Sequence, residues 1–430
     1  MRKLLQGLIL SLLLFSCKES ADAPNLESPS PFSYTDDSKK MAKADYYDKV
    51  LGALVGSAIG DAMGASTEMW HRRDIQLKYG YITGLTPAER AQSPEGTWAN
   101  NLMAGATTDD TRWKYLMVNY FSQVKGEASP SAFSKFINTY YASLTKDLGD
   151  PDIQTSTDIL DDKMEKIDWI KEWARVSLAY EKDSDTYVSS LNRFYGGEMS
   201  CAGQLYSPMF GLVASNSSEA YDLGYTHSLF DIGYAKDISG LVAAMTHLAM
   251  RTKDMDSILN VVPFTDNTGY QDSRLVGRIP YSIWTASMNQ IRVLDTLKNS
   301  NDSLIKPILK TKVPKGYSGT DADWARQEMA YRFLEKDKKA IAFHAGEIWQ
   351  IMITGMGYGK GDFLNTMQFI VNYGRDNDTA AAIAGMILGA KDGYAALPKD
   401  LKEETIRVNR EHLGIDLEQL AQEMTNLQYP

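Results

Sequence analysis

The sequence predicts an all-α protein built as one compact domain. Apolar residues recur at the three- and four-residue spacing of amphipathic helices along most of the chain after residue 41. No run of alternating apolar and polar residues reaches the length of a convincing strand, and no internal repeat is evident. Residues 41–430 are long for one domain but contain no second linker, so we expect them to share one core, for which a hydrophobic content of 43% is ample.

The first 40 residues have the character of a targeting signal followed by a tether. A short basic start precedes an apolar run, Leu4–Phe15, that is too short to cross a bilayer. The run ends in Leu-Phe-Ser-Cys, which resembles the lipobox of bacterial lipoprotein signal peptides and implies cleavage after residue 16 and acylation of Cys17. An ordinary secretory signal with a chance cysteine is the alternative. We expect a signal peptide over 1–16 and a lipidated cysteine with a disordered tether over 17–40, rich in Ser, Pro, Asp and Glu.

Charge and cysteine content narrow the possible partners. The formal net charge of −10 argues against non-specific binding to nucleic acid, because such proteins present basic surfaces to phosphates. With Cys17 acylated, Cys201 is the one cysteine left, so no intramolecular disulfide can form. We therefore expect no nucleic-acid partner, and membrane contact through the lipid on Cys17 only. The location that follows is the cell envelope, at the outer membrane or in the periplasm.

Helices account for most of the predicted domain. Each predicted helix has apolar residues at helical spacing and is bounded by polar, Gly or Pro residues. In chain order they cover residues 46–60, 110–123, 131–144, 166–180, 209–215, 219–225, 231–251, 283–298, 322–335, 339–355, 363–372, 379–393, 399–411 and 416–427.

The connecting segments are irregular or peripheral. Clusters of Gly, Pro and polar residues predict loops. The charged and aromatic stretch of about 145–197 is interpreted as a peripheral insertion or cap. The predicted loops cover residues 60–68, 70–106, 196–208 and 252–278.

The helix predicted near the C-terminus carries the clearest chemistry. Asp376, Asp378 and Thr379 stand directly before a run of small and apolar helix formers. Gly385 and Gly389 lie one turn apart on one face of that helix. Because glycine inside a helix costs up to about 1 kcal/mol against alanine, this pair predicts that another backbone packs very close. Carboxylates at a helix start are also favoured by the helix dipole, so an acidic cap on a core helix is the alternative.

A second acidic turn lies far upstream, where Thr108, Asp109 and Asp110 precede another amphipathic helix. Two turns of hydroxyls and carboxylates make the oxygen-rich ligand set that hard divalent cations prefer. Consecutive carboxylates cannot share one helical face, but at a helix cap they can point to two adjacent metals. Mg²⁺ or Mn²⁺ would suit such a site, and two ions about 3.5–4 Å apart would form a familiar hydrolytic arrangement.

Four separated motifs together resemble those of a known family. In chain order they are Gly56–Gly64 followed by Glu68, Thr108–Thr111, Thr226–Ser228, and Asp376–Thr379 with its Ala/Gly-rich helix. This order is similar to that of the ADP-ribosylglycohydrolases, all-helical enzymes with two magnesium ions that include the dinitrogenase reductase-activating glycohydrolase. The resemblance spans residues 51–393 and implies an all-helical domain around a di-metal centre.

The resemblance also implies a role for each matching residue. The metal ligands would be Thr108, Asp109 and Asp110 from one side, and Asp376, Asp378 and Thr379 from the other. Two metal ions would hold a ribose diol and a water between them, since such ions orient a diol and lower the pKa of bound water. Glu68 would lie nearby as a gate or proton-transfer group, and either Asp110 or Glu68 would handle the proton of the catalysed step. Asp61 would brace the loop or contact the metal ligands from behind.

Two further residues are predicted to bind substrate. His227 would contact a phosphate or ribose, although a lone histidine at a helix boundary is otherwise most often structural. Arg375 stands where the family's second metal motif has its second glycine, and it could pair with Asp376 or reach a substrate anion. Glu347, upstream of that motif, is expected to be exposed to solvent or to contact the ligands from behind.

Two departures from the family bear on the substrate. The family's central Asn-Gly motif has no clean counterpart, and residues 203–208 occupy its place. The aromatic residues of the 145–197 stretch are expected to form a core cap, with a stacking platform for a sugar or base as the alternative.

The function expected from these features is glycosidic bond hydrolysis outside the cytoplasm. A di-magnesium glycohydrolase would cleave an N- or O-glycosidic bond of an ADP-ribose-like or other ribosyl substrate, either a small molecule or linked to a protein. The alternative is a non-catalytic lipoprotein that binds a sugar or nucleotide and retains the fold.

Overall fold

The computed structural model describes residues 41–89, 101–146, 148–149, 157–297, 308 and 311–430. The predicted signal peptide and tether, residues 1–16 and 17–40, lie outside this part of the chain. Met41–Pro430 forms one compact unit. It is all-α, as predicted, and the strands within the described residues are two-residue pairs. None of the described helices combines the length and the apolar character that crossing a membrane requires.

The helices agree with the predicted order, and short helices also occur in stretches predicted to be irregular. Their bounds are α1 Lys43–Gly64, α2 Arg72–Lys78, α3 Asp109–Val124, α4 Pro130–Thr145, α6 Thr157–Lys182, α7 Ser184–Tyr195, α8 Phe210–Val213, α9 Ser217–His227, α10 Ala235–Arg251, α11 Met255–Leu259, α12 Val261–Phe264, α13 Ile279–Thr296, α14 Asp321–Lys336, α15 Ala345–Tyr358, α16 Phe363–Tyr373, α17 Asn377–Asp392, α18 Lys399–His412 and α19 Leu417–Gln428. The short strands are β1 Trp70–His71, β2 Ala88–Glu89, β3 Asn101–Leu102 and β4 Gly374–Arg375.

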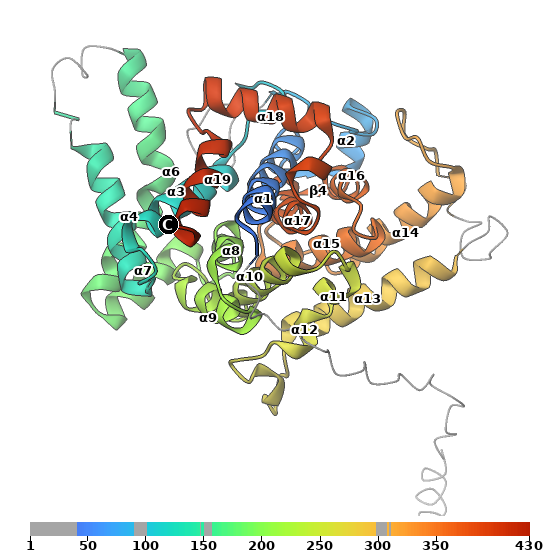
Figure 1. Cartoon of the computed structure of the whole chain (residues 1–430). Helices are drawn as coiled ribbons and strands as arrows, with labels where there is room; N and C mark the ends of the chain where they lie inside the picture. The colour runs from blue at the N-terminus through green and yellow to red at the C-terminus, as the bar shows by residue number, and fades with distance from the viewer. Residues whose placement is uncertain (1–40, 90–100, 147, 150–156, 298–307, 309–310) are drawn as a thin grey trace, which may run out of the picture. The chain divides into compact units, whose positions relative to one another are not determined.

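Helices α1 and α17 run side by side at the centre of the domain (Figure 1). Glycines on both helices allow their backbones to touch. A Cβ atom added to Gly385 would lie 2.2 Å from the carbonyl oxygen of Gly56, and one added to Gly389 would lie 2.0 Å from that of Gly52. The close backbone approach predicted from Gly385 and Gly389 is therefore confirmed, and its partner is α1.

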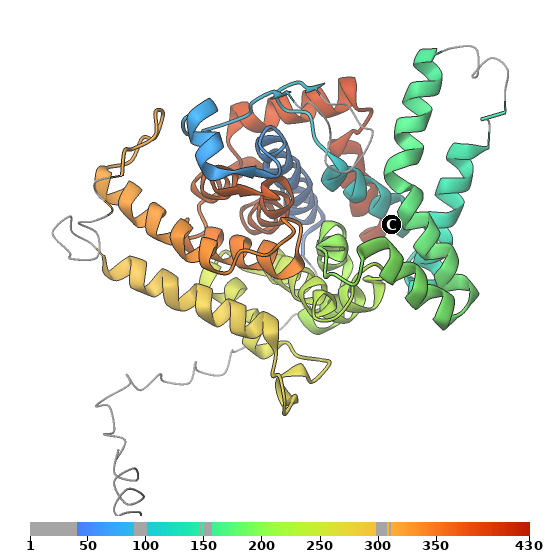
Figure 2. The ribbon, with the colours of Figure 1, turned by 180° about the vertical axis from the view of Figure 1, so that it is seen from behind.

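The other helices pack around this pair. α3, α16, α18 and α19 contact α1, and α10 and α15 contact α17. Figures 1 and 2 show α4, α6 and α7 on one side of the central pair and α13 and α14 on the opposite side. At the boundary of the unit, the Lys43 ammonium donates to the backbone oxygen of Tyr429 at 3.0 Å, so the first and last helices are joined.

Several predicted boundaries are wrong, such as the start of α6, which lies at Thr157 and not at residue 166, and two of them have a clear physical reason. A loop was expected from Gly60, but α1 continues to Gly64 because Gly60 and Gly64 pack directly on the backbone of α17. A helix was expected from residue 339, but α15 begins at Ala345, where the Nδ1 atom of His344 accepts from the backbone N–H of Gly346 at 3.0 Å. This side-chain cap fixes the helix start.

His227 lies in an aromatic cluster of the core, contrary to its predicted contact with substrate. It is 1% exposed and packs against Phe210 with ring centroids 4.4 Å apart. Its Nε2 atom is 3.1 Å from the Tyr120 hydroxyl and its Nδ1 atom is 2.8 Å from the carbonyl oxygen of Leu223. Both ring nitrogens are thus occupied, and the side chain has the surroundings of a structural histidine.

We expect Gly385→Ala to lower the free energy of unfolding. In a helix without close neighbours this change would raise stability by up to about 1 kcal/mol, because alanine favours helix. Here the added methyl group meets the Gly56 carbonyl, and overpacking of this kind costs about 1–3 kcal/mol. Urea denaturation measures the sign of this change in the free energy of unfolding. Gly149→Ala, at a glycine with no atom within 4 Å of its added Cβ, is the control and should change stability little. A stabilised Gly385→Ala variant would contradict the packing.

We also expect His227 to lower the free energy of unfolding at acid pH. Burial lowers the pKa of its ring to about 4, whereas the unfolded chain takes up the proton near pH 6.5. Stability is therefore lost as the pH falls from about 6.5 toward 4, by at most about 1.4 kcal/mol per pH unit. Denaturation between pH 7 and 5 should show a smaller loss for His227→Gln than for the wild type. His412→Gln, at an exposed position of α18, should match the wild type.

Candidate active site

Three carboxylates from separate segments meet at one end of the central helix pair. Glu68, Asp376 and Asp378 are buried, and one carboxylate oxygen from each lies within 4.8 Å of the other two. Glu68 follows the C-terminus of α1, and Asp378 lies in the first turn of α17. A Cβ atom added to Gly64 would lie 2.4 Å from the Cα atom of Asp378, so the same close helix packing brings these segments together.

A short β-ladder fixes the turn that carries Glu68. β1 pairs with β4 antiparallel, with Trp70 opposite Arg375, and the backbone N–H of Met69 donates to the Arg375 carbonyl at 2.6 Å. Met69 and Arg375 both have left-handed backbones, with φ of 64° and 67°. Asn377 adds a side-chain link, because its amide donates to the Thr67 hydroxyl at 2.8 Å.

Asp61 holds the start of α3 against α1. Its carboxylate accepts from the backbone N–H groups of Thr108 and Thr111, each at 3.0 Å, and from both of their hydroxyls, at 3.0 Å and 2.6 Å. Two N–H groups that a helix start leaves without partners are thereby satisfied. Asp61 is a brace, as expected, and the Thr108 hydroxyl keeps its oxygen lone pairs for another contact.

Asp110 joins the two acidic motifs. Its Oδ2 atom accepts from the Thr379 hydroxyl at 3.0 Å, and its Oδ1 atom is 3.5 Å from the Lys114 ammonium. The structure therefore brings together the two motifs that the sequence places more than 250 residues apart. Lys114 is 1% exposed, so its ammonium group is buried within the site beside Asp110.

The buried carboxylates hold more negative charge than the described cations balance. Burial, and next the Asp110 charge, raise the pKa of both Asp61 and Asp376 to about 7. Burial, and next the Glu68 charge, hold the pKa of Asp378 well above its ordinary value. Burial also raises the pKa of Asp110, against the opposing charge of Lys114. Uncompensated buried charge of this kind calls for either protons or a cation.

The donor set fits a divalent metal ion. Oδ1 of Asp378 is buried and has no hydrogen-bond partner among the described residues. Carboxylate and hydroxyl oxygens are the ligands that hard cations such as Mg²⁺ prefer. The predicted ligands Asp110, Asp376, Asp378 and Thr379 supply such atoms, and Glu68 lies close to Asp376 and Asp378, as expected.

A cavity of about 270 Å³ opens beside this cluster. Asp109 and Thr379 from the two acidic motifs line it, together with Cys201 and its neighbours from the 200–205 segment. The remaining wall comes largely from α6 and α7. We call five rings of this lining the aromatic wall: Trp169, Trp173, Phe194, Tyr195 and Phe343. The predicted insertion thus contributes surface to the cavity and is more than a core cap.

Arg375 is paired with Glu347. Its guanidinium donates to the Glu347 carboxylate at 3.2 Å and to the Lys339 carbonyl at 2.9 Å. Glu347 is 2% exposed, whereas the sequence suggested solvent or a contact behind the ligands. Asp376, one expected partner of Arg375, is therefore not its partner here, because Glu347 of α15 takes that place.

Cys201 was not identified from the sequence. Its thiol donates to Oδ2 of Asp376 at 3.5 Å, and its backbone N–H donates to the Phe343 carbonyl at 2.9 Å. A lone cysteine outside any motif carries no local signal of such a role. It reaches the site because the turn that precedes the short helix Ala202–Leu205 packs beside α17, a placement that only the tertiary structure reveals.

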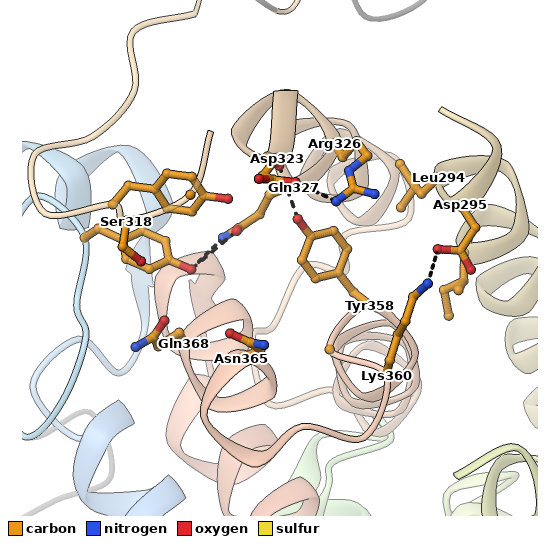
Figure 3. Close-up of a pocket in the computed structure, with 15 residues that line it drawn as sticks. Leu294, Asp295, Ser318, Asp323, Arg326, Gln327, Tyr358, Lys360, Asn365 and Gln368 are labelled. Atoms are coloured by element: carbon orange, nitrogen blue, oxygen red, sulfur yellow. Dashed lines mark hydrogen bonds and ion pairs between the residues drawn. The ribbon is translucent and has the colours of Figure 1, made fainter. Parts of the chain in front are cut away.

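A second cavity, of about 490 Å³, lies between α13, α14, α15 and α16 (Figure 3). Its charged side chains pair within its own walls, Arg326 with Asp323 at 2.7 Å and Lys360 with Asp295 at 2.9 Å. No residue of either acidic motif lines it, whereas Asp109 and Thr379 line the smaller cavity. The larger cavity is therefore not the acidic site.

Three comparisons relate the chain to known proteins. Residues 42–430 match the family described as ADP-ribosylglycohydrolase. A 90-residue stretch is 29% identical to a protein of Escherichia coli K12 named "Uncharacterized protein YegU", and this match spans 21% of the chain and 26% of that protein. A solved structure titled "ADP-ribosylglycohydrolase-related protein complex" is similar with a TM-score of 0.49 and 17% identity, covering 89% of this chain and 99% of that one.

The family match includes every part of the acidic cluster, from Glu68 to Asp378. The chain belongs to the ADP-ribosylglycohydrolase family.

Proposed function

We propose that the protein is a magnesium-dependent glycohydrolase that cleaves an N- or O-glycosidic bond of a ribosyl compound. Family membership supports glycosidic hydrolysis as the class of reaction. The single observation that supports a metal ion is the buried carboxylate cluster. Within it, Oδ1 of Asp378 has no hydrogen-bond partner among the described residues. Mn²⁺ would satisfy the same donors.

The ligands divide between the two acidic motifs. Thr108, Asp109 and Asp110 would approach from the start of α3, and Asp376, Asp378 and Thr379 from the start of α17. Two divalent cations held there would orient a ribose diol and lower the pKa of a bound water. The hydrogen bond from Thr379 to Asp110 and the ion pair of Asp110 with Lys114 fix the Asp110 carboxylate in place, which suits a ligand more than a mobile proton carrier.

Glu68 is the better candidate for proton transfer. Hydrolysis joins the oxygen of water to the anomeric carbon, breaks the glycosidic bond and delivers a proton to the leaving group. A carboxylate can accept the first proton and return it if it lies within hydrogen-bond reach. Glu68 is 7% exposed, against 2% for Asp376 and Asp378, and it sits on a turn held by the β-ladder.

We further propose that the lipobox-like start anchors this domain in the cell envelope through Cys17. The apolar run before Cys17 supports export, and the Ser- and Pro-rich stretch after it suits a tether. Radiolabelled palmitate incorporation, lost in Cys17→Ser, tests the anchor independently of activity.

Asp378→Asn should separate the stability that bound metal adds from the stability of the metal-free fold. Removing one carboxylate from a crowded buried cluster relieves repulsion, so the metal-free variant should be at least as stable as the metal-free wild type. Mg²⁺ or Mn²⁺ at about 100 times its dissociation constant should stabilise the wild type by about 2.7 kcal/mol. The variant should lose this stabilisation, and its affinity for the metal and its rate of ribosyl hydrolysis should each fall more than about tenfold.

Calorimetric metal titration and thermal unfolding measure both effects. Asp392→Asn, at the other end of α17, is the matched control and should keep the response to metal. If metal stabilises Asp378→Asn as much as the wild type, the proposed metal site is wrong. Metal binding without turnover of any ribosyl compound would instead favour the non-catalytic binding protein.

A further inference from the structure

The second cavity, between α13, α14, α15 and α16 (Figure 3), takes no part in the proposed catalysis. Its volume of about 490 Å³ lies within the range of roughly 300–1,000 Å³ that small-molecule sites occupy. None of the proposed metal ligands is among its described lining residues. The cavity is therefore a candidate for a separate binding site, and the chemistry of its lining indicates which class of compound it would hold.

The charges of this lining balance one another. Its described residues include two carboxylates and two cations, and each cation pairs with one of the carboxylates. Arg326 pairs with Asp323, and Lys360 pairs with Asp295. An anionic ligand would compete with the carboxylates for these cations, and a cationic ligand would compete with the cations for the carboxylates. The lining therefore favours an uncharged compound.

The apolar part of the lining is mainly aromatic. Tyr81, Tyr317 and Tyr358 line the cavity, whereas Ile291 and Leu294 are the aliphatic side chains of its described lining, which is little surface for a lipid chain. The rings of Tyr81 and Tyr317 have centroids 4.9 Å apart and planes 82° apart. Parallel rings would form a slot for a flat base. Perpendicular rings form a corner, in which the C–H face of a puckered sugar ring can lie on one ring while its hydroxyls face polar groups.

Carboxamides supply those polar groups. Figure 3 shows Asn365 and Gln368 on one side of the opening and Gln327 on the other. The Gln368 nitrogen donates to the Thr83 carbonyl at 3.1 Å, whereas its side-chain oxygen and the Asn365 amide make no hydrogen bond to another described residue. A carboxamide offers a donor and an acceptor side by side, and each sugar hydroxyl can both donate and accept. Neighbouring hydroxyls of a sugar therefore match these amides.

We infer that this cavity binds an uncharged saccharide, with a ring face on Tyr317 and hydroxyls on Asn365 and Gln368. The site binds the sugar without cleaving it, because Asp295 and Asp323 are both held in ion pairs and neither is free to act as a general acid. The inference does not depend on the proposed function. Such a site would hold the protein at a glycan while the acidic cluster acts on its own substrate.

Saturation-transfer NMR and calorimetry, on protein that contains all of residues 41–430, test the inference with named sugars. Of maltose, cellobiose, lactose and chitobiose, at least one should bind with a dissociation constant on the order of 1 mM or below. The sugar that binds best should bind more tightly than its amino and uronic acid derivatives, which carry a positive and a negative charge. Binding should persist in a metal chelator and in Asp378→Asn, which lies outside the lining.

Two substitutions in the lining should weaken binding of that sugar. Asn365→Ala removes an exposed amide, so the variant should fold normally and bind about fivefold more weakly, as for the loss of one hydrogen bond. Tyr317→Ala removes the ring face and should weaken binding at least about tenfold. The matched controls are Asn192→Ala, at an exposed residue of α7, and Tyr281→Ala, at a half-buried residue of α13. Both residues lie outside the lining, and both variants should bind the sugar as the wild type does.

Each contrary outcome has a distinct meaning. If none of the four sugars binds, or if Asn365→Ala and Tyr317→Ala bind as tightly as the wild type, the saccharide site is wrong, whatever the metal cluster does. If a charged derivative binds more tightly than its neutral parent, the inference of an uncharged ligand is overturned. If sugar binding requires Mg²⁺ and is lost in Asp378→Asn, the sugar occupies the acidic site instead, and the inference is again overturned. Sugar binding by a protein that binds no metal would support the inference while the proposed function fails.

Discussion

The contact between the backbones of α1 and α17 is the constraint on which the rest of the structure depends. Gly56 and Gly385 permit that contact, and no residue with a Cβ atom could replace either without moving a helix. The two axes then lie so close that the end of α1 and the start of α17 share one location. This one helix contact brings together Asp61, Glu68 and Asp378.

These buried carboxylates differ in whether the protein supplies hydrogen-bond donors to all their oxygens. Asp61 accepts four hydrogen bonds from Thr108 and Thr111 and is satisfied by the protein alone. Asp378 lies at the same helix junction but has an oxygen for which the described residues offer no donor. The fold therefore stabilises one acid as a structural brace and leaves the other in need of a cation. Two neighbouring carboxylates of the same chemistry differ only in their donors.

Local sequence signals predicted the parts of the site that are themselves local. Gly385 and Gly389 predicted a close backbone, and paired carboxylates at two helix starts predicted an oxygen-rich cluster. The misses all depend on tertiary placement. Nothing beside His227 shows that Tyr120 will occupy its Nε2 atom, and the pairing of Arg375 with Glu347 requires α15 to lie across β4. The aromatic wall likewise gains its meaning from packing next to Asp109, which composition alone does not reveal.

The central helix pair also has a consequence for the order of folding. About 310 residues lie between Gly64, which ends α1, and Asn377, which begins α17. Both in synthesis and in the proposed export from the N-terminal end, α1 emerges well before α17. Until α17 arrives, the glycine-lined face of α1 has no native partner, and a long loop must close before the two helices can meet. The domain is thus expected to complete its core only when nearly the whole chain is available, and until then the chain is open to chaperones or to aggregation.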